Sequence, residues 1–189
     1  TNNNYTEFDK LDKHRVCGIK LFMGSSTGNM LVDKMNSLLN IFNGTDMLIA
    51  AHCEDQETIK NNIEKYKQKY KGADDIPVSA HPSIRSVPAC YASSELAVRL
   101  AKIAGARLHI LHVSTAKELQ LFSDVPLANK NITAEACVAH LLFTLTHYNS
   151  LGARIKCNPA VKRKTDREAL RTAVNSGPVS YTHLRAHET

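Results

Sequence analysis

Three short apolar runs, each carrying a side chain able to bind a metal ion or move a proton, are the feature that most constrains the fold of this chain. Lys20 lies inside the first run, residues 16–22, which then breaks into a Gly/Ser turn. His52 ends the run 47–52, and His112 ends the segment 108–112. Parallel α/β sheets and barrels keep their active sites at the carboxyl ends of their strands. The three runs therefore predict one site that draws on Lys20, His52 and His112.

Helical patterns separate these runs, and such alternation is typical of parallel βαβ units. No G-x-G-x-x-G follows any predicted strand, which argues against a doubly wound dinucleotide-binding sheet. We therefore expect an α/β fold that forms part of a (β/α)₈ barrel. The expected strands are 16–22, 47–52, 107–113 and 131–135, with a short strand or extended loop at 155–158. The expected helices are 7–15, 30–42, 54–71, 88–104, one opened by the capping box at 114–118, one through 140–145, and one from 165 to Gly177, with a loop at 76–87.

The composition fits an ordinary globular domain and excludes several other classes. Of the 189 residues, 43% are hydrophobic and 22% charged, which argues against disorder. We find no apolar stretch near the ~20 residues of a membrane helix and no signal peptide. The five cysteines are an odd number without a C-x-x-C pair, which predicts reduced thiols in a cytoplasmic protein. The net charge of +6 is dispersed along the chain, so we expect no nucleic-acid partner and no membrane association.

Each candidate side chain also has a simpler interpretation. A lone lysine in an apolar strand is most often held by a structural salt bridge, because burying an unpaired ammonium costs several kcal/mol. His52 alone is compatible with a hydrogen-bonded core histidine. His109 and His112 are three residues apart, so a strand would direct them to opposite faces, and His112 is the better site candidate. Imidazoles that converge with a lysine suit a pair of divalent ions bridged by a carboxylated lysine, with zinc as the default metal.

Five segments of the chain resemble dihydroorotases of the amidohydrolase superfamily and occur in that family's order. The resemblance runs from about Thr1 to Gly177. The segments are GIKLFMGSSTGNM at 18–30, AHCED at 51–55, IRSVPACY at 84–91, HILHVST at 109–115 and CNPA at 157–160.

This resemblance implies a zinc-dependent enzyme that interconverts N-carbamoyl-L-aspartate and dihydroorotate in pyrimidine biosynthesis, acting on a small molecule as a homo-oligomer. By resemblance, Lys20 would be the carboxylated lysine that bridges two zinc ions, His52 and His112 would be metal ligands, and Asn158 would contact the substrate. His140 receives no role, because Val138-Ala139-His140 differs from the family's usual Pro-His-His.

Two parts of the family's site have no counterpart in this sequence. They are the first-strand H-x-H-x-R segment and the last-strand aspartate. The resemblance thus implies an internal fragment, inactive alone, in which residues 1–177 form a barrel portion lacking the first and last strands. Residues 178–189 resemble a translated sequencing adapter, and we expect them to be an unrelated tail without a strand.

Two alternatives stay open. A hydantoinase (dihydropyrimidinase) or an allantoinase shares the lysine and histidines, and the absent first-strand arginine would separate them from a dihydroorotase. A non-catalytic amidohydrolase-like scaffold protein would act through oligomerisation. Such scaffolds usually lose metal ligands, so the presence of all three expected ligands favours an enzyme.

Overall fold

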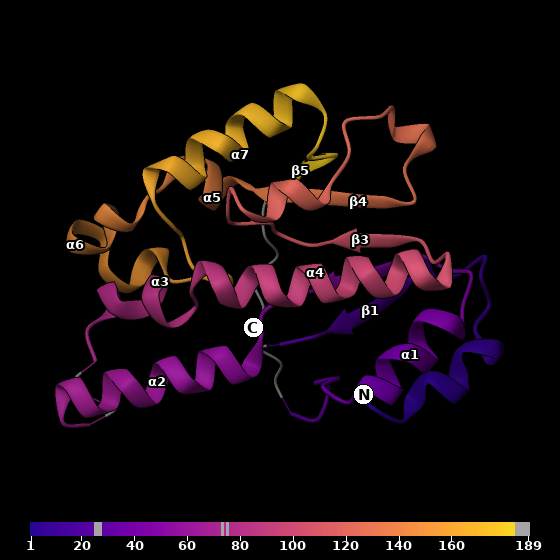
Figure 1. Cartoon of the computed structure of the whole chain (residues 1–189), viewed down its shortest axis with the longest axis horizontal. Helices are drawn as coiled ribbons and strands as arrows, with labels where there is room; N and C mark the ends of the chain where they lie inside the picture. The colour runs from indigo at the N-terminus through magenta and orange to yellow at the C-terminus, as the bar shows by residue number, and fades with distance from the viewer. Residues whose placement is uncertain (25–27, 73, 75, 184–189) are drawn as a thin grey trace.

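The chain folds around a parallel sheet whose strands lie side by side in the order of the sequence, β1-β2-β3-β4-β5 (Figure 1). The computed structural model describes residues 1–24, 28–72, 74 and 76–183. Its strands are β1 Ile19–Phe22, β2 Ile49–His52, β3 Leu108–Ile110, β4 Ile132–Cys137 and β5 Tyr181–His183. A doubly wound sheet reverses its strand order at a switch point, whereas this order runs in one direction as in a barrel. The prediction of a parallel α/β fold is confirmed.

The helices connect successive strands. They are α1 Met35–Asn43, α2 Gln56–Tyr70, α3 His81–Ile84, α4 Val87–Ala104, α5 Val138–Leu142, α6 Tyr148–Leu151 and α7 Lys164–Ser176. Shorter 3₁₀ helices cover Asn4–Lys10, Val78–Ala80, Glu118–Leu121, Leu127–Asn129, Leu145–His147 and Gly152–Ile155. None of the helices within the described ranges has the length and apolarity needed to cross a membrane.

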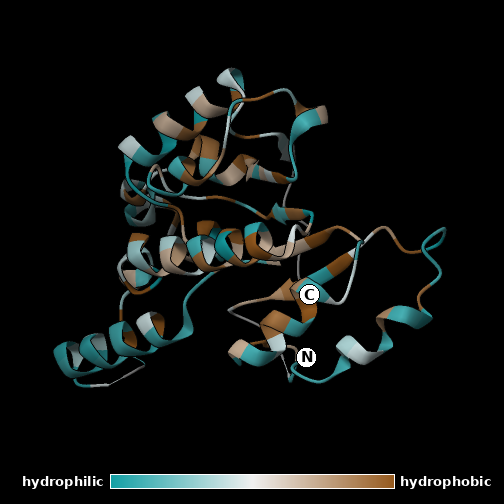
Figure 2. Cartoon of the chain, turned by 45° about the vertical axis from the view of Figure 1, so that its right-hand side comes forward, coloured by the Kyte–Doolittle hydropathy of each residue, from teal (hydrophilic) through white to brown (hydrophobic). Residues whose placement is uncertain are grey.

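The two faces of the sheet differ in chemistry because side chains alternate along each strand. One face is apolar and packs against helices α1, α4 and α7, with Leu21, Ile49, Leu108, Ile110 and Ala134 each at most 1% exposed. Full burial of such a side chain contributes about 1.5–3 kcal/mol. In contrast to this apolar face, helix α2 carries mostly hydrophilic residues (Figure 2). The other face carries polar side chains, which include Lys20, His52, His109, Thr133 and Glu135.

Helix α4 has the clearest sequence signals, and both of its predicted ends are confirmed. Ser86 caps its first turn by accepting a hydrogen bond from the N–H of Ala89, and Pro88 lies in that turn. Gly105 follows the last turn with φ +64°, a left-handed conformation that glycine adopts without strain. The loop expected at 76–87 instead contains α3 and a 3₁₀ turn.

The prediction of a helix after Ser114 is wrong, since only the 3₁₀ helix Glu118–Leu121 forms there. The capping interactions do form: Glu118 accepts hydrogen bonds from the Thr115 hydroxyl at 2.8 Å and from the Ser114 N–H at 3.3 Å.

Strand β5 corrects a second expectation, because residues 181–183 pair in parallel with β4. Val179 is 4% exposed in the core, and the Ser180 N–H donates to the Ala134 carbonyl at 2.8 Å. An open strand edge offers N–H and C=O groups to any extended segment, so pairing here needs no apolar periodicity. The expected tail also includes residues 184–189, which lie outside the described residues. Its unrelatedness to the rest of the chain stays a prediction.

Candidate active site

His52 and His112 meet at the carboxyl ends of β2 and β3. Their Nδ1 and Nε2 atoms are 3.0 Å apart, and their rings pack edge to face at 4.7 Å between centroids. Both residues are buried, at 1% and 5% exposure. The structure thus brings together two of the three residues that the sequence placed in one site.

A carboxylate and a guanidinium hold His52 from its other side. The Nε2 atom of His52 lies 2.9 Å from Oε2 of Glu54, and the same oxygen accepts a hydrogen bond from Nη1 of Arg85. Burial by itself would raise the pKa of Glu54, but the hydrogen bond with His52 and the charge of Arg85 outweigh burial and lower it. Glu54 is therefore an ionised, fully buried carboxylate.

His109 belongs to the same cluster, which sequence reasoning did not foresee. Its ring contacts Thr133 through Nδ1 at 2.8 Å and Glu135 through Nε2 at 3.0 Å, and Glu135 also accepts the backbone N–H of His112 at 3.2 Å. The expectation that His109 and His112 diverge to opposite faces is wrong. Strand β3 ends at Ile110, and His112 adopts a left-handed φ of +41°, so strand alternation does not extend to it.

Glu135 is a further residue that sequence reasoning missed. It is 7% exposed and lies on β4, where its carboxylate links His109 to the turn that carries His112. The sequence did contain a signal for Glu135. It ends the expected strand 131–135, and the strand expected before it, 107–113, contains two histidines.

Lys20 differs from its predicted environment. The sequence indicated a lysine buried in an apolar strand, but its side chain is exposed, with Nζ 5.0 Å from the ring centroid of Phe22. Alternation directs Leu21 into the core and leaves Lys20 and Phe22 on the polar face. Phe22 is in register with His52, and their ring centroids are 6.3 Å apart. Lys20 therefore shares a face with the histidine pair and adjoins it through Phe22.

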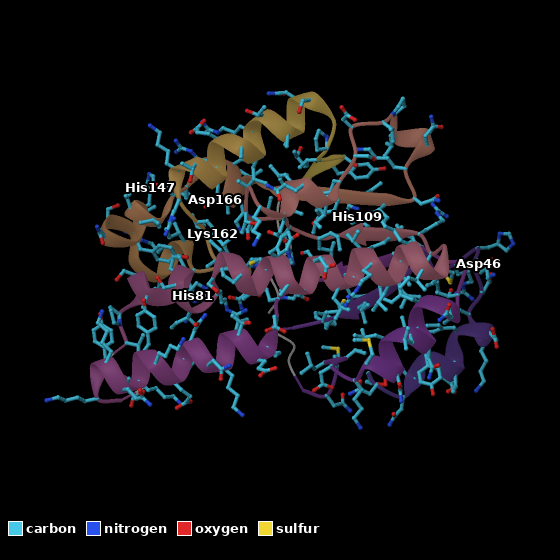
Figure 3. The ribbon with its side chains drawn as sticks, viewed as in Figure 1. Asp46, His81, His109, His147, Lys162 and Asp166 are labelled. Atoms are coloured by element: carbon cyan, nitrogen blue, oxygen red, sulfur yellow. The ribbon has the colours of Figure 1, made fainter. Side chains whose placement is uncertain are left out.

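Asn158 lies in a loop that two histidines hold in place. The Nε2–H of His81 donates to the Cys157 carbonyl at 2.9 Å, and that of His140 donates to the Pro159 carbonyl at 2.9 Å. Burial lowers the pKa of His81 to about 4, so its ring is neutral at physiological pH. His140, which the sequence left without a role, is an anchor for this loop. Figure 3 shows His81 on α3.

A hollow of about 530 Å³ opens beside Asn158 and Arg85. Its wall is mostly apolar, with Ile59, Ile63 and Ile84 among the lining residues. The Oδ1 atom of Asn158 is buried and receives no hydrogen bond from the described part of the chain. Asn158 thus brings an unsatisfied buried acceptor to the wall of this hollow.

The histidine pair fits two ligands of a metal ion. Two nitrogens at 2.0–2.1 Å from a tetrahedral zinc ion are about 3.3 Å apart, close to the 3.0 Å between Nδ1 of His52 and Nε2 of His112. The Glu54 contact matches the outer carboxylate that commonly orients a metal-binding histidine. Within the described ranges, no three His, Cys, Asp or Glu side chains are grouped to hold a metal.

Comparison with known proteins identifies the relatives of this chain. No protein-family model matches it. A dihydroorotase from Halalkalibacterium halodurans is 29% identical over 161 residues, which cover 84% of this chain and 35% of that protein. Other dihydroorotases match at 26–30% identity. The chain is homologous to dihydroorotases. The resemblance indicated by the five motifs is confirmed, and the chain spans about a third of the length of the curated dihydroorotases it matches.

Similarity to solved structures shows the fold to which this chain belongs. An L-hydantoinase (dihydropyrimidinase) from Arthrobacter aurescens matches with a TM-score of 0.85 at 22% identity, covering 96% of this chain and 40% of that one. A dihydroorotase from Campylobacter jejuni matches with a TM-score of 0.54 at 19% identity, covering 97% and 46%. The chain therefore has the fold of part of an amidohydrolase barrel, as predicted. Its sequence is similar to dihydroorotases, while its backbone matches the hydantoinase more closely than that dihydroorotase structure.

Proposed function

We propose that this chain is part of a zinc-dependent dihydroorotase, which interconverts N-carbamoyl-L-aspartate and dihydroorotate. The observation that carries the proposal is the histidine pair at the carboxyl ends of β2 and β3, with nitrogens 3.0 Å apart. The similarity to dihydroorotases at 26–30% identity supports this substrate class. The whole protein would act as a cytoplasmic homo-oligomer. The free cysteines support the compartment, because reduced thiols are typical of cytosolic proteins.

The resemblance to dihydroorotases and the positions of the side chains support a role for each residue. His52 through Nδ1 and His112 through Nε2 would hold one ion, and Lys20, once carboxylated, would bridge it to a second. The bound ions would supply Lewis acidity at the ring carbonyl and activate a water molecule. Asn158 would accept a hydrogen bond from a ring N–H through its buried Oδ1. Glu135 would hold the turn at His112 in place through its hydrogen bond to the backbone.

Hydantoinase activity is the second candidate, because the backbone match to the L-hydantoinase is close. The two candidates differ in substrate, since dihydroorotate carries a carboxylate that hydantoin and dihydrouracil lack. A non-catalytic scaffold is a third possibility, and it predicts no metal binding at His52 and His112.

The test compares substrates and metal content in the full-length protein to which we assign the chain. Hydrolysis of dihydroorotate should exceed that of hydantoin and dihydrouracil, and His52→Asn and His112→Asn should each lower the zinc content and the turnover at least tenfold. His14→Asn is the matched control, because His14 is exposed. Preference for the uncharged rings would favour the hydantoinase, and normal zinc content in both variants would reject the site.

A further inference from the structure

We propose that Glu54 and Arg85 are positioning residues that fix the tautomer of His52, so that Nδ1 keeps its lone pair for the metal. This inference rests on the proposed function for the identity of the ligand. The arrangement itself is observed directly: one carboxylate oxygen lies between an imidazole nitrogen and a guanidinium.

The tautomer follows from what each group can donate. The guanidinium of Arg85 can only donate, so the Oε2 atom of Glu54 is an acceptor, and its 2.9 Å contact with His52 places a hydrogen on Nε2. A neutral imidazole has one N–H, so Nδ1 then carries the lone pair. This is the nitrogen that faces Nε2 of His112 at 3.0 Å. Without metal, His112 donates to His52 across that gap, and with metal both nitrogens would point at the ion.

Arg85 keeps this carboxylate in place. Glu54 is fully buried, and an ionised carboxylate at that depth costs several kcal/mol unless a cation and hydrogen bonds compensate. Arg85 comes from the junction of α3 and α4, and its side chain is 16% exposed beside Glu54. Glu54 contacts His52 and Arg85 through Oε2, while its Oε1 receives no hydrogen bond from the described residues. The carboxylate thus interacts with both His52 and Arg85 through one oxygen atom.

The backbone around Glu54 is also confined. A Cβ added at Gly24 would lie 1.9 Å from the Glu54 carbonyl oxygen, so the segment after β1 passes directly against this residue. A glycine at position 24 permits that approach. The carboxylate is therefore anchored by its backbone as well as by Arg85, which lets it set the ring orientation of His52 rather than follow it.

The experiment reads the tautomer directly by ¹⁵N NMR of histidine-labelled full-length protein after removal of metal. We expect His52 to be protonated at Nε2 in the unmodified protein, and protonation at Nδ1 would overturn the inference without any variant. Glu54→Gln should mix the tautomers, because an amide can donate as well as accept, and should weaken zinc binding 10–100-fold in a chelator competition. Glu57→Gln, an exposed acid of α2, is the control and should change neither readout.

Arg85 variants separate positioning from general stability. Arg85→Lys keeps a cation near Glu54 and should retain most of the zinc affinity, whereas Arg85→Met should behave like Glu54→Gln. Equal zinc affinity in Arg85→Met and the unmodified protein would contradict the proposal for Arg85. Because the tautomer is measured without substrate, a protein inactive on dihydroorotate but protonated at Nε2 of His52 would reject the proposed function and leave this inference intact.

Discussion

The Nδ1 atom of His52 lies 3.0 Å from the Nε2 atom of His112, although the two residues are 60 positions apart in the sequence. Consecutive parallel strands β2 and β3 create this contact, because their carboxyl ends meet at one edge of the sheet. The two nitrogens that face each other are the ones we assign to the metal. The following predictions depend on that assignment and on the surroundings of the pair.

Lys20→Ala should abolish binding of two metal ions and activity in the full-length protein. The substitution removes the proposed bridging anion and would leave two cations without a shared ligand. Metal content per chain and turnover are the measurements, and Lys60→Ala on α2 is the control, since Lys60 is also exposed. Two ions per chain with near-normal turnover in Lys20→Ala would reject the assignment. A short carboxylic acid added to this variant should restore part of the activity.

Asn158→Ala should weaken substrate binding and slow turnover without changing the metal content. Its buried Oδ1 faces no donor in the described chain, and an amide is a poor zinc ligand. The KM for dihydroorotate should rise about tenfold, in line with the loss of roughly 1 kcal/mol or more for one hydrogen bond. Loss of zinc from this variant would contradict the division of roles between Asn158 and the histidines.

His81 should make the protein less stable at acidic pH. Its pKa is lowered to about 4 in the folded state, against about 6.5 for an unperturbed histidine. The unfolded chain therefore binds more protons between these values, so the free energy of unfolding falls as pH drops from 6.5 to 4. The loss approaches roughly 3 kcal/mol at pH 4 and below.

Urea unfolding of metal-free protein at pH 7.5 and 4.5 tests this point. His81→Asn should lose less stability over this interval than the unmodified protein, while His14→Asn should lose the same amount as the unmodified protein. Parallel curves for His81→Asn and the unmodified protein would show that His81 is not the titrating group.

The 189-residue chain expressed alone should hydrolyse no dihydroorotate and should self-associate. It offers Lys20, His52 and His112, fewer ligands than two ions require, and β1 and β5 are the edge strands of its described sheet. Exposed edges pair with other chains. Gel filtration and an assay with added zinc and bicarbonate measure both outcomes. A monomer with zinc-dependent turnover would show that the ligand set assigned to this chain is wrong.

The sequence by itself determined the fold class and the location of the candidate site in the fold. Apolar runs of strand length alternating with amphipathic helices require parallel βαβ units, because only such units bury both kinds of surface together. The position of His52 at the end of its run then placed it at the edge of the sheet where the carboxyl ends of the strands meet. The ends of α4 were also readable, since Pro88 suits the first turn of a helix and Gly105 takes the left-handed conformation that ends one.

Only the tertiary structure decided the environment of each side chain. Lys20 is exposed rather than buried because the face of β1 that it occupies is not the one covered by helices. His112 shares the polar face with His109 because β3 ends at Ile110, and a strand end cannot be read from a continuous apolar run. Arg85 reaches the site from the junction of α3 and α4, and Glu135 reaches it from β4; no local pattern encodes contacts between residues so far apart. Long-range packing, which depends on the whole chain, sets these contacts.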